Sequence, residues 1–309
     1  MAAPSVTMFA PPVKAALLAA GWYARQLDSA TFPGVLVLCY HGLRSASWRD
    51  REPAFPNLHV HETTFEGHCR VIAQTCQPIG IGQWRAAIAG GQPLPPRPVL
   101  MTFDDGYRSV FDVARPILLR YHMPAAIFIC SDPVRRRQLL WFDAVARRRG
   151  GEAAAQSCRM LPYDEWRAAV DACATPAADD DPLAPMTAEQ IRTLVADGFD
   201  VGVHTATHAP LSHAPLDEQR VELSSCREAL EGWTGGPVTA LAYPWGKPQT
   251  DYTDETVGIA SHLGFDVAFT TAPSFARPDE RPLERSRFLV LSEVTPAELA
   301  HRMTYSWSR

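Results

Sequence analysis

The chain has 309 residues, a formal net charge of -5 and a hydrophobic fraction of 46%. This length permits a substantial core, arranged as one α/β barrel or as about two domains. Twenty-seven prolines in so hydrophobic a chain indicate a globular protein with many loops and argue against disorder. No block of lysine and arginine indicates a nucleic-acid surface, and we expect the arginine triplets at 135–137 and 147–149 on solvated helix faces.

The seven cysteines are odd in number and form no Cys-x-x-Cys pair. They predict neither a disulfide framework nor a thiolate zinc site, and they suit buried positions in a reducing compartment. No apolar run reaches the roughly 18 residues that a membrane helix needs. Residues 13–27 predict a mature N-terminal helix that is able to lie on a membrane surface, with a weak signal peptide as the alternative. We therefore expect a cytoplasmic protein, either free or associated with a membrane through this helix, rather than a secreted or periplasmic one.

Strand and helix patterns alternate along the chain from residue 34 onward. Short apolar runs predict strands at 34–40, 99–103, 125–130, 199–204, 238–243 and 267–270, with 288–291 as the last candidate. Longer patterns predict helices at 64–77, 110–121, 187–198, 216–233 and 254–263. Pro116 predicts a kink in the second helix, and Thr187 with Gln190 forms a capping box that begins the third. No Gly-x-Gly-x-x-Gly follows any strand, so the alternation favours a barrel-like α/β fold over a dinucleotide-binding sheet.

The section from about 135 to 185 interrupts this alternation. It is rich in alanine and arginine and contains the acidic run 177–181, so we expect a largely helical insertion with an exposed acidic loop. Trp141, Phe142 and Trp166 would dock the insertion against the body by ordinary packing. The predicted organisation is an N-terminal helix and lead-in over 1–33, followed by a single barrel domain over 34–309 that carries the insertion.

Two adjacent carboxylates, Asp104 and Asp105, close the strand at 99–103. In a regular strand their side chains would point to opposite faces, so both reach one site only if the chain turns there, which Gly106 allows. Adjacent ionised carboxylates repel each other, and a cation or a shared proton is the usual reason for such a pair in a partly buried place. The alternative is that Asp-Asp-Gly is simply a polar turn.

Further polar clusters also follow predicted strands. His41 comes after the first strand, His204 and His208 after a later one, and 243–245 (Tyr-Pro-Trp) after the next. The C-terminal ends of barrel strands are where α/β barrels build active sites. His-x-x-x-His at the start of a helix places both imidazoles on one face, as in a two-histidine metal grip. Two imidazoles and one carboxylate leave a position for water, which suits a hydrolytic zinc site and would also accept cobalt or nickel.

The motifs 102–106 (Thr-Phe-Asp-Asp-Gly) and 204–208 (His-Thr-Ala-Thr-His) together resemble those of the polysaccharide deacetylases with a chitooligosaccharide-deacetylase homology domain, carbohydrate esterase family four. Residues 38–41 (Leu-Cys-Tyr-His) resemble the first-strand motif of the subgroup that acts on biofilm and surface polysaccharides, and 242–246 (Ala-Tyr-Pro-Trp-Gly) resemble the third motif. The resemblance extends from about Val35 to Leu291, without the insertion. It implies a distorted barrel of seven to eight strands that removes the acetyl group from an N-acetylated sugar.

Carried over position by position, the resemblance assigns Asp105, His204 and His208 as metal ligands and Asp104 as the catalytic base. It also implies that the backbone N–H of Trp245 stabilises the oxyanion, while Pro244 fixes its approach and the Trp245 ring covers the sugar or the acetyl methyl. Tyr107 and Tyr243 complete the predicted substrate contacts.

The chain also departs from the family pattern. Ala242 stands where many members have an arginine that orients the base, so Arg285 or Arg287 would replace it, or Asp104 would be less tightly held. No late Leu-x-His motif supplies a general acid; His262 lies in a helix pattern and His301 near the end of the chain. His41 is the better candidate for the acid or a supporting role, with a structural role as the alternative. His59, His61 and His68 are expected as solvated or substrate-edge residues rather than as a second metal site.

Three functions remain open at this point. The first is a metal-dependent hydrolase of cell-surface glycan biosynthesis that removes the N-acetyl group from an N-acetylhexosamine in a glycolipid, an O-antigen-like glycan or a polysaccharide precursor. The second is an amide hydrolase that acts on a small cyclic ureide or imide. The third is a catalytically degenerate carbohydrate-binding protein. In each case we expect no nucleic-acid partner, and the sequence leaves the oligomeric state undetermined.

Overall fold

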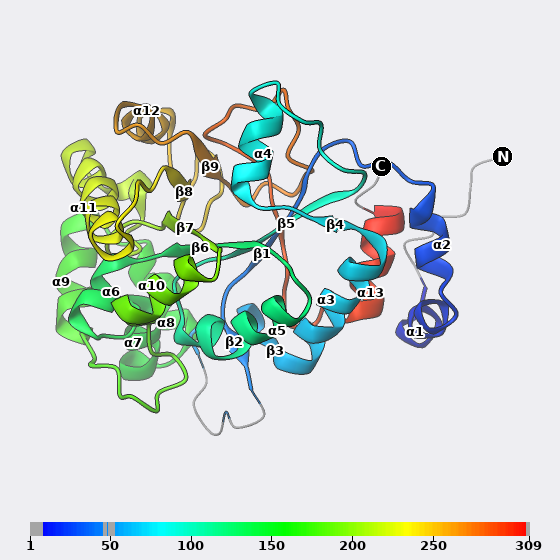
Figure 1. Cartoon of the computed structure of the whole chain (residues 1–309). Coiled ribbons are helices and arrows are strands. Elements are labelled where there is room, and N and C mark those ends of the chain that lie inside the picture. Colours follow the sequence, from blue (N-terminus) through cyan, green and yellow to red (C-terminus); the bar gives the residue numbers. More distant parts are fainter. Residues whose placement is uncertain (1–8, 46–47, 49–52, 307–309) are drawn as a thin grey trace.

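The computed structural model describes residues 9–45, 48 and 53–306 (Figure 1). Eight strands form one parallel sheet: β1 (Leu36–Tyr40), β4 (Gln77–Pro78), β5 (Pro98–Phe103), β6 (Ala125–Ile129), β7 (Asp200–Val203), β8 (Ala240–Ala242), β9 (Val267–Phe269) and β10 (Phe288–Leu289). Their order is β10-β1-β5-β6-β7-β8-β9, and β4 pairs with the start of β5. A separate pair of short parallel strands consists of β2 (Leu43–Arg44) and β3 (Val60–His61).

The large sheet curls into a distorted barrel. Its two outermost strands, β9 and β10, are connected through residues 270–287, in which Arg285 forms an isolated bridge with Phe269. This is the fold class that the sequence predicts, and each of the seven predicted strand segments overlaps a strand of this sheet. The strands β2 (Leu-Arg), β3 (Val-His) and β4 (Gln-Pro) are absent from the prediction, because none of them is an apolar run.

Helices cover the outer surface of the sheet, and further helices lie to either side of it (Figure 1). They are α1 (Pro11–Ala19), α2 (Trp22–Asp28), α3 (Glu62–Thr75), α4 (Ile81–Ile88), α5 (Arg115–Arg120), α6 (Ser131–Arg136), α7 (Trp141–Arg149), α8 (Glu152–Arg159), α9 (Tyr163–Cys173), α10 (Ala188–Ala196), α11 (Leu216–Thr234), α12 (Asp254–His262) and α13 (Pro296–His301). Single 3₁₀ turns are η2 (Pro56–Leu58) and η4 (Leu211–His213), and π-helical segments are η3 (Val110–Ala114) and η5 (Arg302–Ser306). Among the described helices, none is both long and apolar enough to cross a membrane.

Two predicted helices take a more complex form. The pattern over 13–27 divides into α1 and α2, because Gly21 adopts a left-handed conformation with φ 66° that ends the first helix. The pattern over 110–121 begins as the π-helical η3 and continues as α5, whose second residue is Pro116. The irregular turn directly precedes this proline, which fits the predicted kink.

Residues 131–173 contain four consecutive helices, α6 to α9, between β6 and β7. They lie together on one side of the barrel beside α11 (Figure 1). The acidic loop after them is exposed at Asp179 and Asp180, but the expectation of full exposure is wrong for Asp181. Its carboxylate is buried because it pairs with Arg147 of α7 at 2.7 Å.

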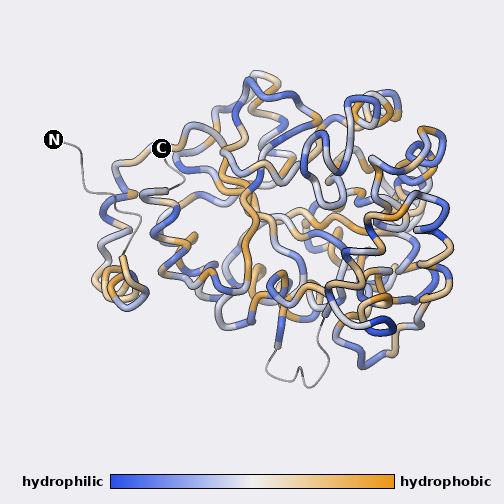
Figure 2. The backbone as a smooth tube through the Cα atoms, turned by 180° about the vertical axis from the view of Figure 1, so that it is seen from behind, coloured by the Kyte–Doolittle hydropathy of each residue, from blue (hydrophilic) through white to orange (hydrophobic). Residues whose placement is uncertain are grey.

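The sheet is hydrophobic on both faces, as parallel strands between two layers require. The strands appear as a hydrophobic band through the middle of the molecule (Figure 2). Alternate residues separate into two apolar clusters: Leu36 and Leu38 pack with the helices outside, and Val35 and Val37 pack with the barrel interior. All seven cysteines are buried with free thiols.

Candidate active site

The carboxylates at the end of β5 reach the site because the chain turns after Asp104. The backbone N–H of Asp104 still donates to the Tyr40 carbonyl at 2.9 Å, so this residue continues the strand and points to the same side as Thr102. Asp105 has φ 76° and Gly106 has φ 80°. The left-handed turn therefore begins one residue before the glycine, and it keeps Asp105 from pointing to the opposite face.

The two histidines are placed by a tight turn after β7. The backbone N–H of His204 donates to the Ile129 carbonyl at 3.1 Å and fixes the start of the turn against β6. Thr205 and His208 both have positive φ, at 64° and 60°. The Thr205 hydroxyl accepts a hydrogen bond from the His208 backbone N–H at 2.9 Å, which closes the turn. The residues form a turn rather than the helix start that the spacing predicts, but both imidazoles still meet.

These two turns bring a carboxylate and two imidazoles into one buried triangle. The Oδ1 atom of Asp105 lies 3.4 Å from Nε2 of His204 and 3.4 Å from Nε2 of His208. Ligand atoms that each lie about 2.0–2.1 Å from a tetrahedral zinc ion are about 3.3 Å apart. Oδ1 of Asp105 is buried and has no hydrogen-bond partner among the described residues. The separation, donor atoms and orphaned oxygen all fit a divalent metal.

The orientation of His204 also fits metal binding. Its Nδ1 lies 2.7 Å from the carbonyl oxygen of Ala242, which only accepts hydrogen bonds. Nδ1 therefore carries the proton, and Nε2 presents a lone pair to the triangle. Burial lowers the pKa of His208 to about 3, which leaves this imidazole neutral. Burial also lowers the pKa of His204, but Asp104 and Asp105 raise it more, so a metal would compete with a proton there.

Asp104 is held by a buried arginine, Arg287, which directly precedes β10. Arg287 donates from Nη1 to Oδ1 at 2.8 Å and from Nη2 to Oδ2 at 2.7 Å, and it is fully buried. Burial raises the pKa of Asp104, but the Arg287 guanidinium and His204 outweigh this effect and hold that pKa well below the usual range. Of the two arginines that the sequence leaves open as replacements at Ala242, Arg287 contacts Asp104. Arg285 instead donates to the Arg277 carbonyl and lies over the Trp84 ring.

Side chains of α7 and α11 contact the turn that carries His204 and His208 and hold it in place. Trp141 of α7 donates from its indole to the His208 carbonyl at 2.9 Å, and the Phe142 ring lies 5.0 Å from the His208 imidazole. Glu222 of α11 accepts from the Thr207 backbone N–H at 2.9 Å and from its hydroxyl at 2.7 Å. These contacts hold a turn with two unfavourable φ values in a single arrangement.

Residues 91–268, more than half of the chain, match the family model for polysaccharide deacetylase. The chain belongs to the polysaccharide deacetylase family. It is 22% identical over 250 residues to YxkH of Bacillus subtilis, which is named as a polysaccharide deacetylase; the match covers 79% of this chain and 67% of that protein. A segment of 49 residues is 49% identical to the poly-beta-1,6-N-acetyl-D-glucosamine N-deacetylase of Escherichia coli K12, over 16% of this chain and 7% of that protein.

Solved structures share the family's fold with this chain. The deacetylase PplD of Streptococcus pyogenes, solved in complex with acetate, has a TM-score of 0.66 and 20% identity, over 89% of this chain and 99% of PplD. IcaB from Ammonifex degensii has a TM-score of 0.61 and 22% identity, over 88% of this chain and 98% of that one. These likenesses confirm the predicted fold of a distorted deacetylase barrel.

The remaining predicted site residues of this family member differ in their placement. His41 lies beside Asp104, with ring nitrogen and carboxylate oxygen within 4.8 Å, and burial lowers the pKa of its imidazole. Trp245 is half-buried with its ring 5.2 Å from that of His208, and Pro244 precedes it. Tyr107 lies beside the site, but its hydroxyl donates to Asp143 at 2.6 Å. Tyr243 stacks on Tyr252 in the core, 4.0 Å between ring centroids, so its side chain is not placed for the predicted substrate contact.

The other histidines differ in burial and in their hydrogen-bond partners. His61 is exposed and caps α3, as a solvated residue would. His59 and His68 are buried, so the solvated alternative is wrong for both, while a place at the substrate edge stays a prediction. His68 lies 2.7 Å from the Val294 carbonyl and 3.2 Å from the Tyr40 hydroxyl, whereas His59 packs against the Tyr107 ring at 4.9 Å. Of the late histidines, His262 bonds within α12 and His301 lies beside Tyr23.

Sequence reasoning missed one polar pair at this site. Asp143 of α7 is buried, and it accepts from the Ala54 backbone N–H at 2.8 Å and from the Tyr107 hydroxyl at 2.6 Å. The signal was an acidic residue directly after Trp141 and Phe142, in a segment otherwise expected to pack by apolar contacts. The pair joins the inserted helices to the turn that carries Asp105.

Proposed function

We propose that the chain is a metal-dependent N-deacetylase that cleaves the acetamide of an N-acetylhexosamine in a glycolipid, an O-antigen-like glycan or a polysaccharide precursor. The observation that carries this proposal is the triangle of Asp105, His204 and His208 directly beside an ionised, clamped Asp104. Membership of the polysaccharide deacetylase family supports the reaction class. The local similarity to an N-deacetylase of an N-acetylglucosamine polymer supports the class of sugar.

Asp105, His204 and His208 would hold the metal, with zinc the best match to one carboxylate and two imidazoles. A divalent cation there supplies Lewis-acid chemistry, because it polarises a carbonyl group and makes water more acidic. Asp104 stays ionised through its two bonds with Arg287, so it is able to accept the proton of the attacking water. The water oxygen adds to the acetyl carbon, the C–N bond breaks, and acetate and a free amine are formed.

Two further groups of the chain serve this reaction in our proposal. The backbone N–H of Trp245 has no acceptor among the described residues, so it is free to donate to the oxygen that gains negative charge on the acetyl group. His41 lies beside Asp104 and is our candidate for the group that passes the water's proton from Asp104 to the leaving amine. The intact metal positions and the clamped base argue against a catalytically degenerate protein.

The experiment combines metal analysis with acetate release from N-acetylglucosamine oligosaccharides. We expect Asp104→Asn to keep the metal and to lose about 10²–10⁴-fold in kcat/KM, the usual contribution of general acid–base catalysis. Asp105→Asn should lose both the metal and the activity, because one of three ligands is neutralised. Asp197→Asn, whose carboxylate pairs with Arg115 on the outer surface, is the matched control and should keep both. Acetate release that is unchanged in Asp104→Asn would contradict the proposal.

A further inference from the structure

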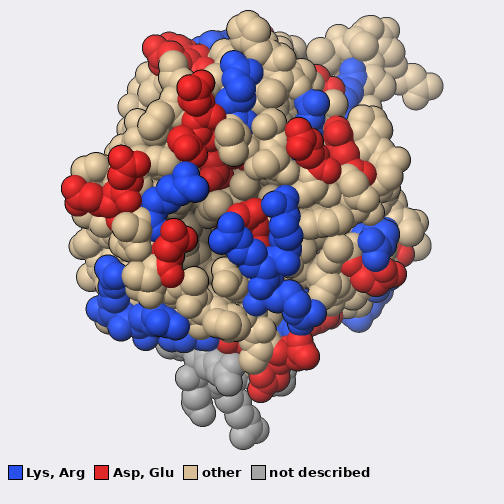
Figure 3. Space-filling model, turned by 90° about the vertical axis from the view of Figure 1, so that its left-hand side faces the viewer, with Lys and Arg blue, Asp and Glu red and all other residues tan. Residues whose placement is uncertain are grey.

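A second cavity lies against the outer side of the histidine turn. Its volume is about 310 Å³, and it is enclosed by α6, α7, α9 and α11. Ala206 and Thr207 of the histidine turn line it, whereas the three residues of the metal triangle are not among the described residues that do. This cavity is therefore distinct from the site of the proposed reaction. It opens on the face of α9 and α11, where basic and acidic side chains alternate around a hollow (Figure 3).

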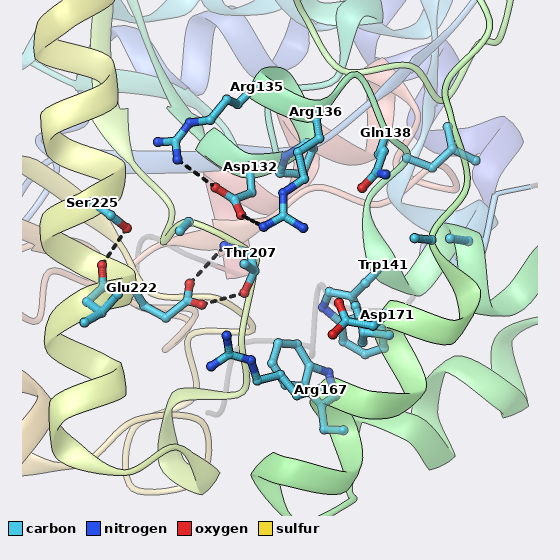
Figure 4. Close-up of a pocket in the computed structure, with 18 of the residues that line it drawn as sticks. Asp132, Arg135, Arg136, Gln138, Trp141, Arg167, Asp171, Thr207, Glu222 and Ser225 are labelled. Carbon is cyan, nitrogen blue, oxygen red and sulfur yellow. Dashed lines mark hydrogen bonds and ion pairs between the residues drawn. The ribbon is translucent and has the colours of Figure 1, made fainter.

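The cavity offers both donors and acceptors of hydrogen bonds. Arg135 and Arg136 lie on one side and Arg167 on the other, with Asp132, Thr207 and Glu222 between them (Figure 4). Each arginine already has a carboxylate partner: Asp132 pairs with Arg135 at 3.5 Å and with Arg136 at 3.0 Å, and Glu218 pairs with Arg167 at 3.0 Å. The charges thus compensate within the cavity instead of summing to one sign.

Aromatic side chains form part of the cavity wall. Trp166 and Tyr163 of α9 line it, and their rings stack with centroids 5.4 Å apart. The indole Nε1 of Trp166 is buried and has no hydrogen-bond partner among the described residues, although Trp166 is only 1% exposed. A buried donor without an acceptor is costly. Because Trp166 borders the cavity, its indole N–H signal reports on a ligand bound there.

We propose that this cavity binds one neutral sugar unit, a hexose or an N-acetylhexosamine, as a second saccharide site. A sugar ring presents an apolar face to aromatic side chains and hydroxyl groups that both donate and accept. The cavity provides Tyr163 and Trp166 at its wall, together with carboxylates that are already paired with arginines. Its volume lies at the lower end of the range for small-molecule sites, as a single sugar unit requires.

An anionic ligand suits the same residues less well. A phosphate would have to displace Asp132 from Arg136 and Glu218 from Arg167, and it would approach the buried carboxylate of Glu222. A purely apolar ligand would leave these charged groups without water or partners. The proposal rests on these cavity residues and does not require that the metal site be a deacetylase.

The indole N–H signals in a ¹⁵N-correlated NMR spectrum test this inference directly. The chain has eight tryptophans, and a Trp166→Phe variant identifies the signal of interest. Titration with N-acetylglucosamine and its disaccharide should shift the Trp166 signal saturably, with a roughly millimolar Kd for so small a ligand. The Trp245 signal reports separately on the metal site, and Trp84, which lies against Phe269 on another part of the barrel, serves as a remote reference.

A plugged cavity provides the matched control. Val221 of α11 lines the opening and is 55% exposed, so Val221→Tyr fills the mouth without disturbing the core. Leu216→Tyr places the same side chain at a 53% exposed position of the same helix, outside the cavity. We expect about tenfold weaker binding at the Trp166 signal in Val221→Tyr and unchanged binding in Leu216→Tyr.

Three outcomes would overturn the inference. The first is a shift of the Trp245 signal alone, which would mean that sugars bind only at the metal site. The second is a Trp166 shift that persists with the same Kd in Val221→Tyr. The third is a Trp166 shift with inorganic phosphate but with neither sugar. Because binding is measured without turnover, failure of the proposed deacetylation would leave each of these results interpretable.

Discussion

Two buried carboxylates near the metal triangle, Asp104 and Asp143, have opposite tendencies toward protonation. Asp104 belongs to the barrel, and its partner is the guanidinium of Arg287. Asp143 belongs to the inserted helix α7, and its partners are a backbone N–H and the neutral hydroxyl of Tyr107. The pKa of Asp104 is held well below the usual range, whereas burial raises the pKa of Asp143 from the ordinary 3.8 to about 7.

The difference shows that the partner, more than the depth, decides the charge of a carboxylate at this site. Burial disfavours the ionised form of both groups. Two neutral donors recover only part of the lost hydration of Asp143, while a bidentate guanidinium more than recovers that of Asp104. The barrel thus keeps Asp104 ionised, whereas Asp143 of the insertion is close to half protonated at neutral pH.

The largest effect is expected when the partner of Asp104 is removed. Arg287→Gln leaves a buried carboxylate without its cation, which costs about 3–5 kcal/mol of unfolding free energy. Denaturant unfolding at pH 7 measures this loss. In the double variant Arg287→Gln/Asp104→Asn the unpaired charge is gone, and we expect most of the stability to return.

Arg285→Gln is the matched control for this change. Arg285 is also nearly fully buried, yet no carboxylate among the described residues forms an ion pair with it. Its removal leaves no buried anion behind, so the loss should be clearly smaller than for Arg287→Gln. Equal losses in the two variants, with no recovery in the double variant, would show that Arg287 acts through packing rather than as the partner of Asp104.

The fold follows largely from local patterns in the sequence. Buried parallel strands such as β5 appear as continuous apolar runs, and α10 begins at the capping box that Thr187 and Gln190 predict. The break at Gly21 was less visible, since a single glycine within a helical pattern is tolerated at a cost of about 1 kcal/mol and does not by itself end the helix. α4 and α13 are short and were not predicted.

The candidate site was predictable where residues lie next to strand ends. Asp105, His204 and His208 meet because carboxyl ends of parallel strands gather at one edge of the barrel. The choice between Arg285 and Arg287 was not predictable, because residues two apart in an extended segment share a face and the deciding contact with Asp104 joins positions 183 residues apart. The Tyr107–Asp143 pair joins segments 36 residues apart, and no local pattern encodes that contact.

The next effect concerns the pH dependence of stability through Asp143. Its pKa is raised in the folded protein, so between pH 4 and 7 the folded state binds more protons than the unfolded state. The unfolding free energy of the wild type should therefore fall with rising pH in this window, by up to about 4 kcal/mol in total. Asp143→Asn mimics the protonated form and removes this contribution.

The difference in unfolding free energy between the wild type and Asp143→Asn separates the contribution of Asp143 from those of all other titrating groups. Denaturant unfolding at pH 4 to 8, with a chelator present, should show the advantage of Asp143→Asn growing up to about pH 7 and then levelling. A difference that stays constant with pH would mean that Asp143 keeps an ordinary pKa in the fold. The contrast between the two carboxylates would then be lost.

The smallest effect is expected from the hydroxyl that binds Asp143. Tyr107→Phe removes one hydrogen bond at nearly constant volume, which costs about 1 kcal/mol. Because that hydrogen bond lowers the pKa of Asp143, its loss should raise this pKa further, and the pH at which the difference from Asp143→Asn levels should move upward. Tyr163→Phe, which removes a hydroxyl bonded to Glu218, is the control and should leave that pH unchanged. If Tyr107→Phe costs stability without moving the pH profile, the Tyr107 hydroxyl stabilises the fold independently of the charge on Asp143.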